Sequence, residues 1–442
     1  MEGRDDTADV ASSEAPARRP LRRWRDDLRL IESRDLRLVL LSRLVSDFGT
    51  GMAPIALAFG VLALPGGSAS GLGLVLVAAA LPRLVFLLLG GVIADRVRSR
   101  ARLLAATEAV AAIAQLTAAM LFLTGHASVP ALAAVALVNG TSRSIFYPTM
   151  TGLVPHLAPG DALQSANALI RLSMSLAGIL GTALGGLLVA TAGAGWALLV
   201  DAVTYAVSAA LLAAVRAGTT PRVDDAGIER ASVVDDLLHG WHEFVARRWV
   251  WLVVVLFSFA NVGFTMTIGV LGPVRAQTSF SGATSWAVVM AAFMAGSLVG
   301  VVAAMRLRPE RPMLVAMLAE LTIVLPVASL AVPMPVAVVA AMFFVNGLAL
   351  NVFEILWSTS LQQHIPPESL SRVASYDWFG SMALTPVALA AAGPLAAGIG
   401  LGPALWVSCA LCSVTAVALL DPQVRRLRAP DRSPDPGRRG RV

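Results

Sequence analysis

Ionisable side chains interrupt several long apolar stretches of this sequence, and they are the residues best placed to do chemistry. They are Arg43 and Asp47 in the first stretch, then Arg83, Arg143, Arg171, Asp201 and Glu354 in later ones. A charge at the centre of a bilayer costs at least about 2–3 kcal/mol, so it is expected to line an internal cavity or to pair with another charge. Arg43 and Asp47 lie one helical turn apart, which predicts a local ion pair. A buried carboxylate can also bind and release a proton as its surroundings change.

The composition indicates that these residues lie in a membrane protein. Of the 442 residues, 57% are hydrophobic and 14% are charged, whereas a typical soluble domain is about 25% charged. Apolar stretches of about 20 residues recur, which is the length that a helix needs to cross the hydrocarbon. The predicted fold class is an all-α membrane protein with twelve transmembrane helices, which begin near Leu36, Gly73, Leu103, Val129, Gln164, Trp196, Trp249, Ser285, Met313, Pro335, Ser371 and Pro403.

The basic residues indicate the topology. All 34 are arginines, and most of them gather in the connections on one side of the predicted membrane, together with both termini. By the positive-inside rule this side is the cytoplasm. The net charge of +6 is therefore attributed to membrane topology, and nucleic-acid binding is not expected. A composition without lysine and rich in alanine, arginine and glycine suggests a bacterial source. We therefore expect a multi-pass protein of a bacterial cell (inner) membrane.

The chain divides into two similar halves. Two tails that are expected to be disordered and cytoplasmic, residues 1–33 and 422–442, flank two six-helix bundles, residues 34–216 and 249–421. A cytoplasmic linker with an amphipathic helix, residues 217–248, joins the bundles. The repeated segments are Asn139-Gly140 with Asn346-Gly347, Glu108 with Glu320, and Asp47-Phe48-Gly49 with Asn261-Val262-Gly263. Offsets near 210 residues, kept in the same order, indicate a duplication.

A short polar stretch ends the second apolar segment and contains Gly91, Asp95, Arg96, Arg98 and Arg100. A carboxylate there can bind the positive end of a neighbouring helix, and the arginines can bind acidic partners or anionic lipid. The simpler alternative is a basic turn that only sets topology. The Gly-x-x-x-Asp-Arg pattern resembles the loop between helices 2 and 3 of the major facilitator superfamily of secondary transporters, although the usual Gly-Arg-Arg continuation is replaced by Arg98-Ser99-Arg100. The resemblance implies two bundles that rock around a substrate cavity.

Other segments narrow the resemblance. Residues 161–169, 181–186, 201–205 and 239–241 are similar to the macrolide-efflux and enterobactin-exporter branch of that superfamily, and the similarity spans about residues 34–425. It implies export driven by the proton gradient. The antiporter signature of the superfamily has Gly-Pro where Gly181-Thr182 stands here. A small-residue face permits either sliding contact between helices or ordinary tight packing, and here it consists of Gly178, Gly181, Gly185 and Gly186.

The resemblance also assigns roles to the intramembrane charges. Spans 1, 4, 7 and 10 line the cavity in this superfamily, which implies that Asp47, Arg143 and Glu354 lie there. Asp47 and Glu354 are the candidate proton carriers, with Asp201 behind them. For each carboxylate the alternative is a structural ion pair with an arginine.

Another carboxylate, that of Asp377, is assigned to the cytoplasmic gate. Asp377, near the start of span 11, is predicted to contact Arg96 as part of a latch that closes the cytoplasmic side in the outward-open state. The alternative is a charge at the helix N-terminus that stabilises the helix dipole.

The sequence contains no phosphate-binding loop, nucleophile–base set or metal-ligand cluster, so we expect no enzymatic activity, no cofactor and no metal. Cys409 and Cys412 lie in an apolar run without a second ligand pair and are interpreted as packing residues. The predicted function is proton-driven export of amphipathic small molecules, such as macrolides, other drugs or siderophores, by a monomer in the lipid bilayer. The alternatives are an uptake symporter or facilitator of the same fold, and a non-transporting membrane sensor or scaffold.

Overall fold

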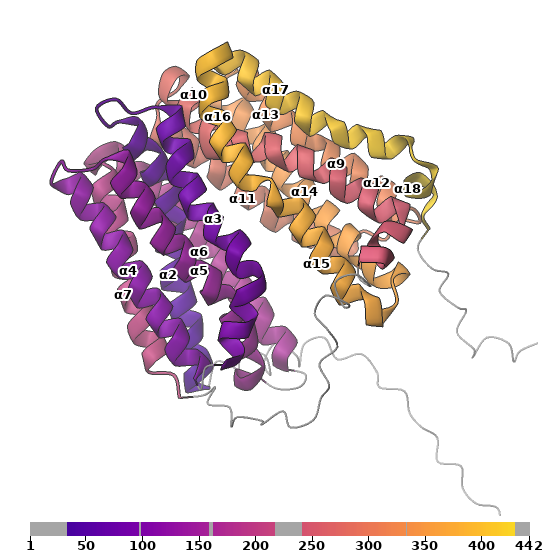
Figure 1. Cartoon of the computed structure of the whole chain (residues 1–442), viewed down its shortest axis with the longest axis horizontal. Helices are drawn as coiled ribbons and strands as arrows, with labels where there is room; N and C mark the ends of the chain where they lie inside the picture. The colour runs from indigo at the N-terminus through magenta and orange to yellow at the C-terminus, as the bar shows by residue number, and fades with distance from the viewer. Residues whose placement is uncertain (1–32, 97–98, 159–161, 217–240, 333, 429–442) are drawn as a thin grey trace, which may run out of the picture.

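The computed structural model describes residues 33–96, 99–158, 162–216, 241–332 and 334–428 (Figure 1). The regular elements of these residues are helices. The first half contains α2 (Arg34–Leu62), α3 (Ala69–Arg96), α4 (Arg100–Leu123), α5 (Val129–Leu157), α6 (Ala162–Ala192) and α7 (Ala194–Ala213). The second half contains α9 (Arg248–Met266), η2 (Thr267–Leu271), α10 (Gly272–Ser279), α11 (Ala283–Arg306), α12 (Pro312–Glu320), η3 (Leu321–Ile323), α13 (Val324–Ala331), α14 (Val336–His364), α15 (Pro367–Ala383), α16 (Thr385–Ile399), α17 (Leu401–Ser413), η4 (Val414–Leu420) and α18 (Pro422–Arg426).

These helices are long and apolar enough to cross a membrane. Eleven such stretches occur among the described residues. The twelfth is α3, a helix of 28 residues whose apolar part is described over Ala69–Pro82. The all-α membrane fold predicted from the sequence is confirmed, because each half supplies six crossings.

In three membrane crossings of the second half, the regular α-helix changes type or breaks shortly before a proline. A π-helical segment, η2, ends two residues before Pro273, and the 3-10 segment η3 ends three residues before Pro326. The break between α15 and α16 at Leu384 lies two residues before Pro386. Proline has no N–H and crowds the preceding turn, so the regular i to i−4 pattern is lost on its N-terminal side. These three crossings are therefore built from shorter pieces, and a fourth crossing changes from α17 to the 3-10 segment η4 at Val414.

The two halves repeat the same internal packing. A Cβ on Gly49 of α2 would lie 2.6 Å from Oδ1 of Asp201, so α2 and α7 approach closely there. The equivalent Gly263 of α9 faces α17 in the same way, where its Cβ would lie 3.0 Å from Sγ of Cys412 and would also meet the carbonyl of Ser408. Glycine is needed at both positions because any side chain would collide with the neighbouring helix.

The halves meet at one end of the molecule and diverge toward the other (Figure 1). We call the end at which α2 begins and α7 ends the terminal end, because Nη1 of Arg34 donates to the carbonyl of Ala214 there at 3.3 Å. In the second half, α9 begins next to α18, since Arg248 pairs with Asp421 at 2.9 Å. Contacts between the halves run along α6 with α11 and along α3 with α16, from mid-helix to the opposite, far end.

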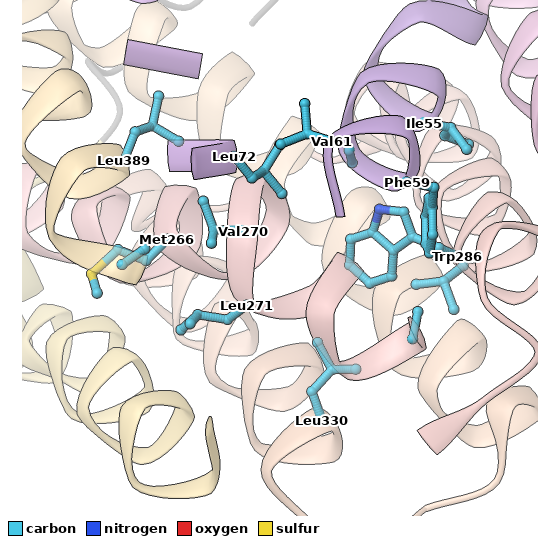
Figure 2. Close-up of a cluster of buried hydrophobic side chains, with 14 of the residues drawn as sticks. Ile55, Phe59, Val61, Leu72, Met266, Val270, Leu271, Trp286, Leu330 and Leu389 are labelled. Carbon is cyan, nitrogen blue, oxygen red and sulfur yellow. The ribbon is translucent and has the colours of Figure 1, made fainter. Parts of the chain in front are cut away.

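One hydrophobic cluster joins the halves at this far end (Figure 2). Figure 2 shows Phe59 of α2 beside Trp286 of α11, and both side chains are at most 5% exposed. The other labelled members from both halves are Ile55, Val61, Leu72, Met266, Val270, Leu271, Leu330 and Leu389. Burial of apolar surface across the two bundles therefore stabilises the conformation that is closed at the far end.

The structure describes the last part of the linker, from residue 241 on. Residues 241–246 are helical, and Phe244 is 6% exposed and packs against Tyr376 of α15, with ring centroids 5.8 Å apart. Residues 1–32, 217–240 and 429–442 lie outside the described residues, so the predictions for both tails and for most of the linker stay predictions.

Candidate functional site

A buried group of charges lies within the first half, and we call it the charge cluster: Arg43, Asp47 and Glu108, with Ser46. Nη2 of Arg43 donates to Oδ1 of Asp47, and Nη1 reaches Oε1 of Glu108 at 3.5 Å. Oγ of Ser46 lies 3.1 and 3.2 Å from the two oxygens of Glu108. The predicted ion pair between Arg43 and Asp47 is therefore present. Arg43 is only 2% exposed, and one guanidinium faces two carboxylates in an environment that excludes water.

A second arginine lies nearby on α5. Nη1 of Arg143 donates to Oη of Tyr205 at 2.7 Å and to Oγ1 of Thr50 at 3.1 Å. Nη2 of the same residue donates to Oη of Tyr147 at 2.6 Å. Hydrogen bonds from a charged donor are roughly twice as strong as neutral ones, so these contacts fix the guanidinium plane. Arg143 thereby ties α5 to α2 and α7.

A chain of polar side chains continues from α5 through α4 to α7. Nδ2 of Asn139 donates to Oε1 of Gln115 at 3.1 Å, and Nε2 of Gln115 donates to Oδ2 of Asp201 at 2.6 Å. Asp201 is fully buried, and its Oδ1 has no hydrogen-bond partner in the described structure. Burying an ionised carboxylate is costly when one of its oxygens has no hydrogen-bond partner. The free energy of this arrangement therefore depends on whether Asp201 carries a proton.

The central cavity borders this polar chain and has a volume of about 350 Å³. Its polar wall comes from the first half and includes Gln115, Asn139, Arg143 and Tyr205. Its opposite wall includes Leu389 of α16, which belongs to the second half. The cavity therefore lies between the bundles, with one cationic side chain and several neutral hydrogen-bonding groups on an otherwise apolar lining.

A second hollow, which we call the aromatic cavity, lies nearer the terminal end and has a volume of about 600 Å³. Arg171 of α6 lines it from the first half, and Glu354 of α14 and Asp377 of α15 line it from the second. Its aromatic residues are Phe257, Phe353, Trp357 and Trp378. Phe353 stacks on Phe257 and on Trp357, with ring centroids 5.3 and 6.3 Å apart. The lining therefore combines charges of both signs with flat apolar surfaces.

The intramembrane charges singled out in the sequence fall into separate places. Arg143 lines the central cavity, Arg171 and Glu354 line the aromatic cavity, and Asp201 is buried behind the central one. The expectation that Asp47 lines the substrate cavity stays a prediction. Asp47 is 7% exposed and lies in neither lining, because Arg43 draws it into the charge cluster.

The gating stretch is only partly described. Arg83, Gly91, Asp95 and Arg96 fall within α3, but their side chains lie outside the described part of the structure, as does all of Arg98. Arg100 is the first residue of α4. The predicted contact between Arg96 and Asp377 therefore stays a prediction.

The position of Asp377 itself is clear. α15 begins at Pro367, ten residues before Asp377, so the alternative of a charge at the helix N-terminus is wrong. The hydropathy pattern predicts a later start, near Ser371, because the first turns of α15 are polar. Oδ2 of Asp377 instead accepts a hydrogen bond from Nε1 of Trp357 at 2.9 Å. Asp377 thus joins α15 to α14 at the wall of the aromatic cavity.

The glycines of α6 face two different partners. A Cβ on Gly181 would collide with the carbonyl of Phe48, and one on Gly185 would lie 2.8 Å from Cα of Met52, so both pack against α2 of the same half. Gly178 and Gly186 instead face α11 of the second half. A Cβ on Gly178 would lie 2.6 Å from Cε of Met294, and one on Gly186 would collide with Ala287. Part of the predicted small-residue face therefore lies between the bundles, where relative movement would take place.

Comparisons with known proteins identify the architecture. The family model of the Major Facilitator Superfamily matches residues 39–383. The chain belongs to this superfamily. A multidrug efflux pump named Tap, from Mycolicibacterium fortuitum, is 28% identical over 417 residues, which cover 89% of this chain and 97% of the relative. The predicted membership of the superfamily is therefore confirmed.

Solved structures share the fold at low identity. A mutant form of the nucleoside transporter NupG has a TM-score of 0.70 and 15% identity, covering 88% of this chain and 98% of its own. A bacterial homologue of the iron transporter ferroportin in an inward-facing state has a TM-score of 0.68 and 16% identity, again covering 88% and 98%. These similarities support the two-bundle architecture and do not extend to substrate.

Several polar residues of the site carried no functional assignment in the sequence interpretation. Glu108 and Glu320 served only as markers of the repeat, although each is a charge within an apolar segment. Gln115, Asn139 and Tyr205 are neutral, and neutral polar residues do not stand out in an apolar helix. A signal was available for Gln115, because its position two turns after Glu108 places both on the same face of α4.

Proposed function

We propose that this transporter is a proton-driven exporter of amphipathic small molecules, such as macrolides, other drugs or siderophores, and that it works by alternating access in a bacterial cell membrane. Protons, the substrate and the lipid bilayer are its partners, and a monomer suffices because both cavities lie within one chain. The observation that carries the proposal is the aromatic cavity, to which both bundles contribute and which combines four aromatic rings with Arg171, Glu354 and Asp377.

The lining of this cavity suits an amphipathic ligand. Stacked rings offer broad apolar contact, and a cationic or polar group on the ligand can approach Glu354 or Asp377. An anionic group can approach Arg171. A volume of about 600 Å³ falls within the range of about 300–1,000 Å³ that drug-sized ligands occupy.

The direction of transport is supported by the efflux relative, and the conformation indicates the end at which a substrate would enter. If both termini are cytoplasmic, as the arginine distribution predicts, the terminal end at which the bundles diverge faces the cytoplasm. A substrate would then enter the aromatic cavity from inside the cell and move toward the central cavity. The 28% identity to a multidrug efflux pump over nearly the whole chain favours export over uptake.

Proton coupling is supported by carboxylates within the membrane spans, of which Asp47 and Asp201 are buried and Glu354 is exposed in the wall of the aromatic cavity. Asp47 and Glu354 are the candidate carriers, and Asp201 is the third. The geometry favours Glu354 over Asp47, because Glu354 lines a cavity whereas Asp47 is held by Arg43. A carrier must meet the solvent or the substrate in at least one conformation, and a position in the cavity wall suits Glu354 to this requirement.

Accumulation in everted membrane vesicles tests the proposal. With a proton gradient, vesicles that contain the wild type should accumulate ethidium, erythromycin or a siderophore, and an uncoupler should abolish the accumulation. Glu354→Gln should lose uncoupler-sensitive accumulation and keep normal expression, whereas Glu310→Gln, at an exposed position after α11, should behave as the wild type. Gradient-independent equilibration would favour a facilitator. Accumulation in right-side-out vesicles would favour an uptake symporter, and the absence of any proton or substrate flux would favour a sensor or scaffold.

A further inference from the structure

Glu320 is a buried carboxyl group in the second half that the proposed mechanism has not yet used. It is the last residue of α12, directly before the 3-10 segment η3, and it is 1% exposed. Neither Oε1 nor Oε2 has a hydrogen-bond partner in the described structure. An ionised carboxylate at such a position would lose its hydration without compensation, which strongly disfavours the ion.

Comparison with the equivalent residue of the first half shows which polar partners Glu320 lacks. Its counterpart in the first half, Glu108, has Arg43 at 3.5 Å and Ser46 at 3.1 Å. The offset that relates Asp47 to Asn261 places Phe257 at the position of Arg43 and Ala260 at the position of Ser46. Both groups that would stabilise an anion are therefore replaced by apolar side chains. The second half keeps the carboxyl group without its partners.

The other titratable or charged groups around Glu320 do not supply a cation. The elements packed against α12 and η3 are α13, α14, α17, η4 and α18. Their titratable or charged side chains are Glu354 and His364 on α14, Cys409 and Cys412 on α17, and Arg425 and Arg426 on α18, with Asp421 at the N-cap of α18 and Arg311 at the N-cap of α12. Arg311, Arg425 and Arg426 are exposed, and Asp421 pairs with Arg248. His364 contacts the carbonyl oxygens of Ser360 and Arg428.

Glu354 connects Glu320 to the aromatic cavity. Glu354 lies on α14, which packs against both α12 and η3, the two elements that meet at Glu320. Glu354 also lines the aromatic cavity, together with Arg171 of the first half. Glu320, which is buried in the bundle, thus lies beside a helix from which Glu354 reaches the wall of the aromatic cavity.

We propose that Glu320 is the proton-binding site of the second half: it holds a proton in the conformation described here and exchanges it with the aromatic cavity through Glu354. Neither oxygen of Glu320 has a hydrogen-bond partner in the described conformation, so the transfer requires a movement that brings the two carboxyl groups into hydrogen-bond contact. The O–H bond of Glu320 then breaks and an oxygen of Glu354 takes the proton, so that Glu320 becomes an anion while Glu354 becomes neutral. This inference rests on the proposed function only for its role in transport. The presence of the proton on Glu320 can be measured separately.

Infrared spectroscopy of the purified full chain tests the proton directly. At neutral pH the wild type should show the C=O stretch of a neutral carboxyl group, and the difference spectrum against Glu320→Gln should contain this band. The control Glu310→Gln should leave the band unchanged, because Glu310 is exposed. A second variant, Phe257→Arg, restores the cation found in the first half and should remove the band by stabilising the Glu320 anion. The second variant keeps the test valid if Glu320→Gln does not fold.

Transport by the same variants tests the role. Glu320→Gln should reduce proton-driven accumulation of ethidium or erythromycin in everted vesicles to the level seen with an uncoupler, while exchange of labelled substrate across the membrane without a gradient continues. A wild-type spectrum without the band would overturn the proposal, as would full proton-driven accumulation by Glu320→Gln or accumulation that follows a sodium gradient instead. If the wild type transports nothing, the proposed function fails, and the infrared band still decides whether Glu320 holds a proton.

Discussion

Replacement of Arg43 by methionine is the most direct test of the charge cluster. Methionine keeps much of the length and apolar volume of the side chain and removes the guanidinium. Asp47 and Glu108 would then face each other without a cation at side-chain exposures of 8% and 4%. Breaking a buried ion pair by removing one partner leaves an uncompensated charge, and in this cluster it would leave two.

The expected magnitude follows from the geometry. At the 3.5 Å that separates Arg43 from Glu108, a pair of unit charges attracts by about 5 kcal/mol at an effective dielectric constant of about 20. Desolvation of the three groups offsets part of this attraction. Measured losses for single partners of buried pairs are about 3–5 kcal/mol, and we expect Arg43→Met to fall in this range. The triple variant Arg43→Met, Asp47→Asn, Glu108→Gln should recover most of the loss, because it leaves no charge unpaired.

The assay is thermal unfolding of the purified protein in detergent, followed by the loss of monodisperse material. Arg37→Met is the matched control, since Arg37 lies on the same helix but is exposed, and its effect should stay within about 0.5 kcal/mol. Arg43→Met should unfold at a clearly lower temperature than Arg37→Met. The triple variant should lie close to the wild type.

Two results would refute the reasoning. An Arg43→Met protein as stable as the control would mean that the guanidinium does not compensate the carboxylates. A triple variant less stable than Arg43→Met would mean that the two acidic side chains stabilise the fold by themselves.

Three further variants test other parts of the site. Gly186→Leu adds a side chain where even a Cβ collides with Ala287, so it should weaken the contact of the bundles at the far end and increase labelling of cysteines introduced there; unchanged labelling would contradict this. Arg143→Lys cannot reproduce the forked hydrogen bonds to two tyrosine hydroxyls, and losing one charged hydrogen bond of about 1.5 kcal/mol should lower transport about tenfold. Charge reversal at both Arg96 and Asp377 should restore the activity that either single reversal loses, and additive losses in a double-mutant cycle would refute the latch.

The sequence was sufficient for the architecture because the bilayer imposes strict requirements. Hydrocarbon forces each apolar stretch into a helix, and the length of the stretch fixes the number of crossings. The repeat of Asn139 and Asn346 then divides the crossings into two sixes. The pair of Arg43 and Asp47 was predictable for a similar reason, since one helical turn separates them and no other helix is needed to bring them together.

Contacts between side chains of different helices are harder to predict from the sequence. The spacing within α2 does not reveal that Glu108 of α4 completes the charge cluster, because rotation of each helix about its axis depends on packing across the bundle. The same limit applies to the chain from Asn139 through Gln115 to Asp201, which crosses three helices. Span 1 lines the central cavity through Thr50, Ala53, Pro54 and Leu57. Asp47 lies outside that lining, since a strong partner on its own helix holds it inside the bundle.

The acidic residues of the two halves have different partners, and this difference indicates that the halves have different roles in transport. A carboxylate that is paired with an arginine gains little by accepting a proton, because protonation would leave the guanidinium buried and uncompensated. This describes Asp47 and Glu108 in the first half. Glu320 and Glu354 have no arginine of their own half at hand in the described structure, so each can change its charge without stranding a buried cation.

Among the described residues, the arginine that lines the aromatic cavity together with Glu354 is Arg171, and it belongs to the other bundle. If the bundles rock, the distance from Glu354 to Arg171 must change while the distances within each bundle do not. Protonation of Glu354 would then be coupled to the relative position of the bundles, whereas the charge cluster would stay constant through the cycle. We therefore expect Arg171→Gln to uncouple proton movement from transport and Arg43→Met to act mainly on stability. Comparison of proton-to-substrate stoichiometry in these two variants separates the roles, and equal uncoupling in both would refute the division.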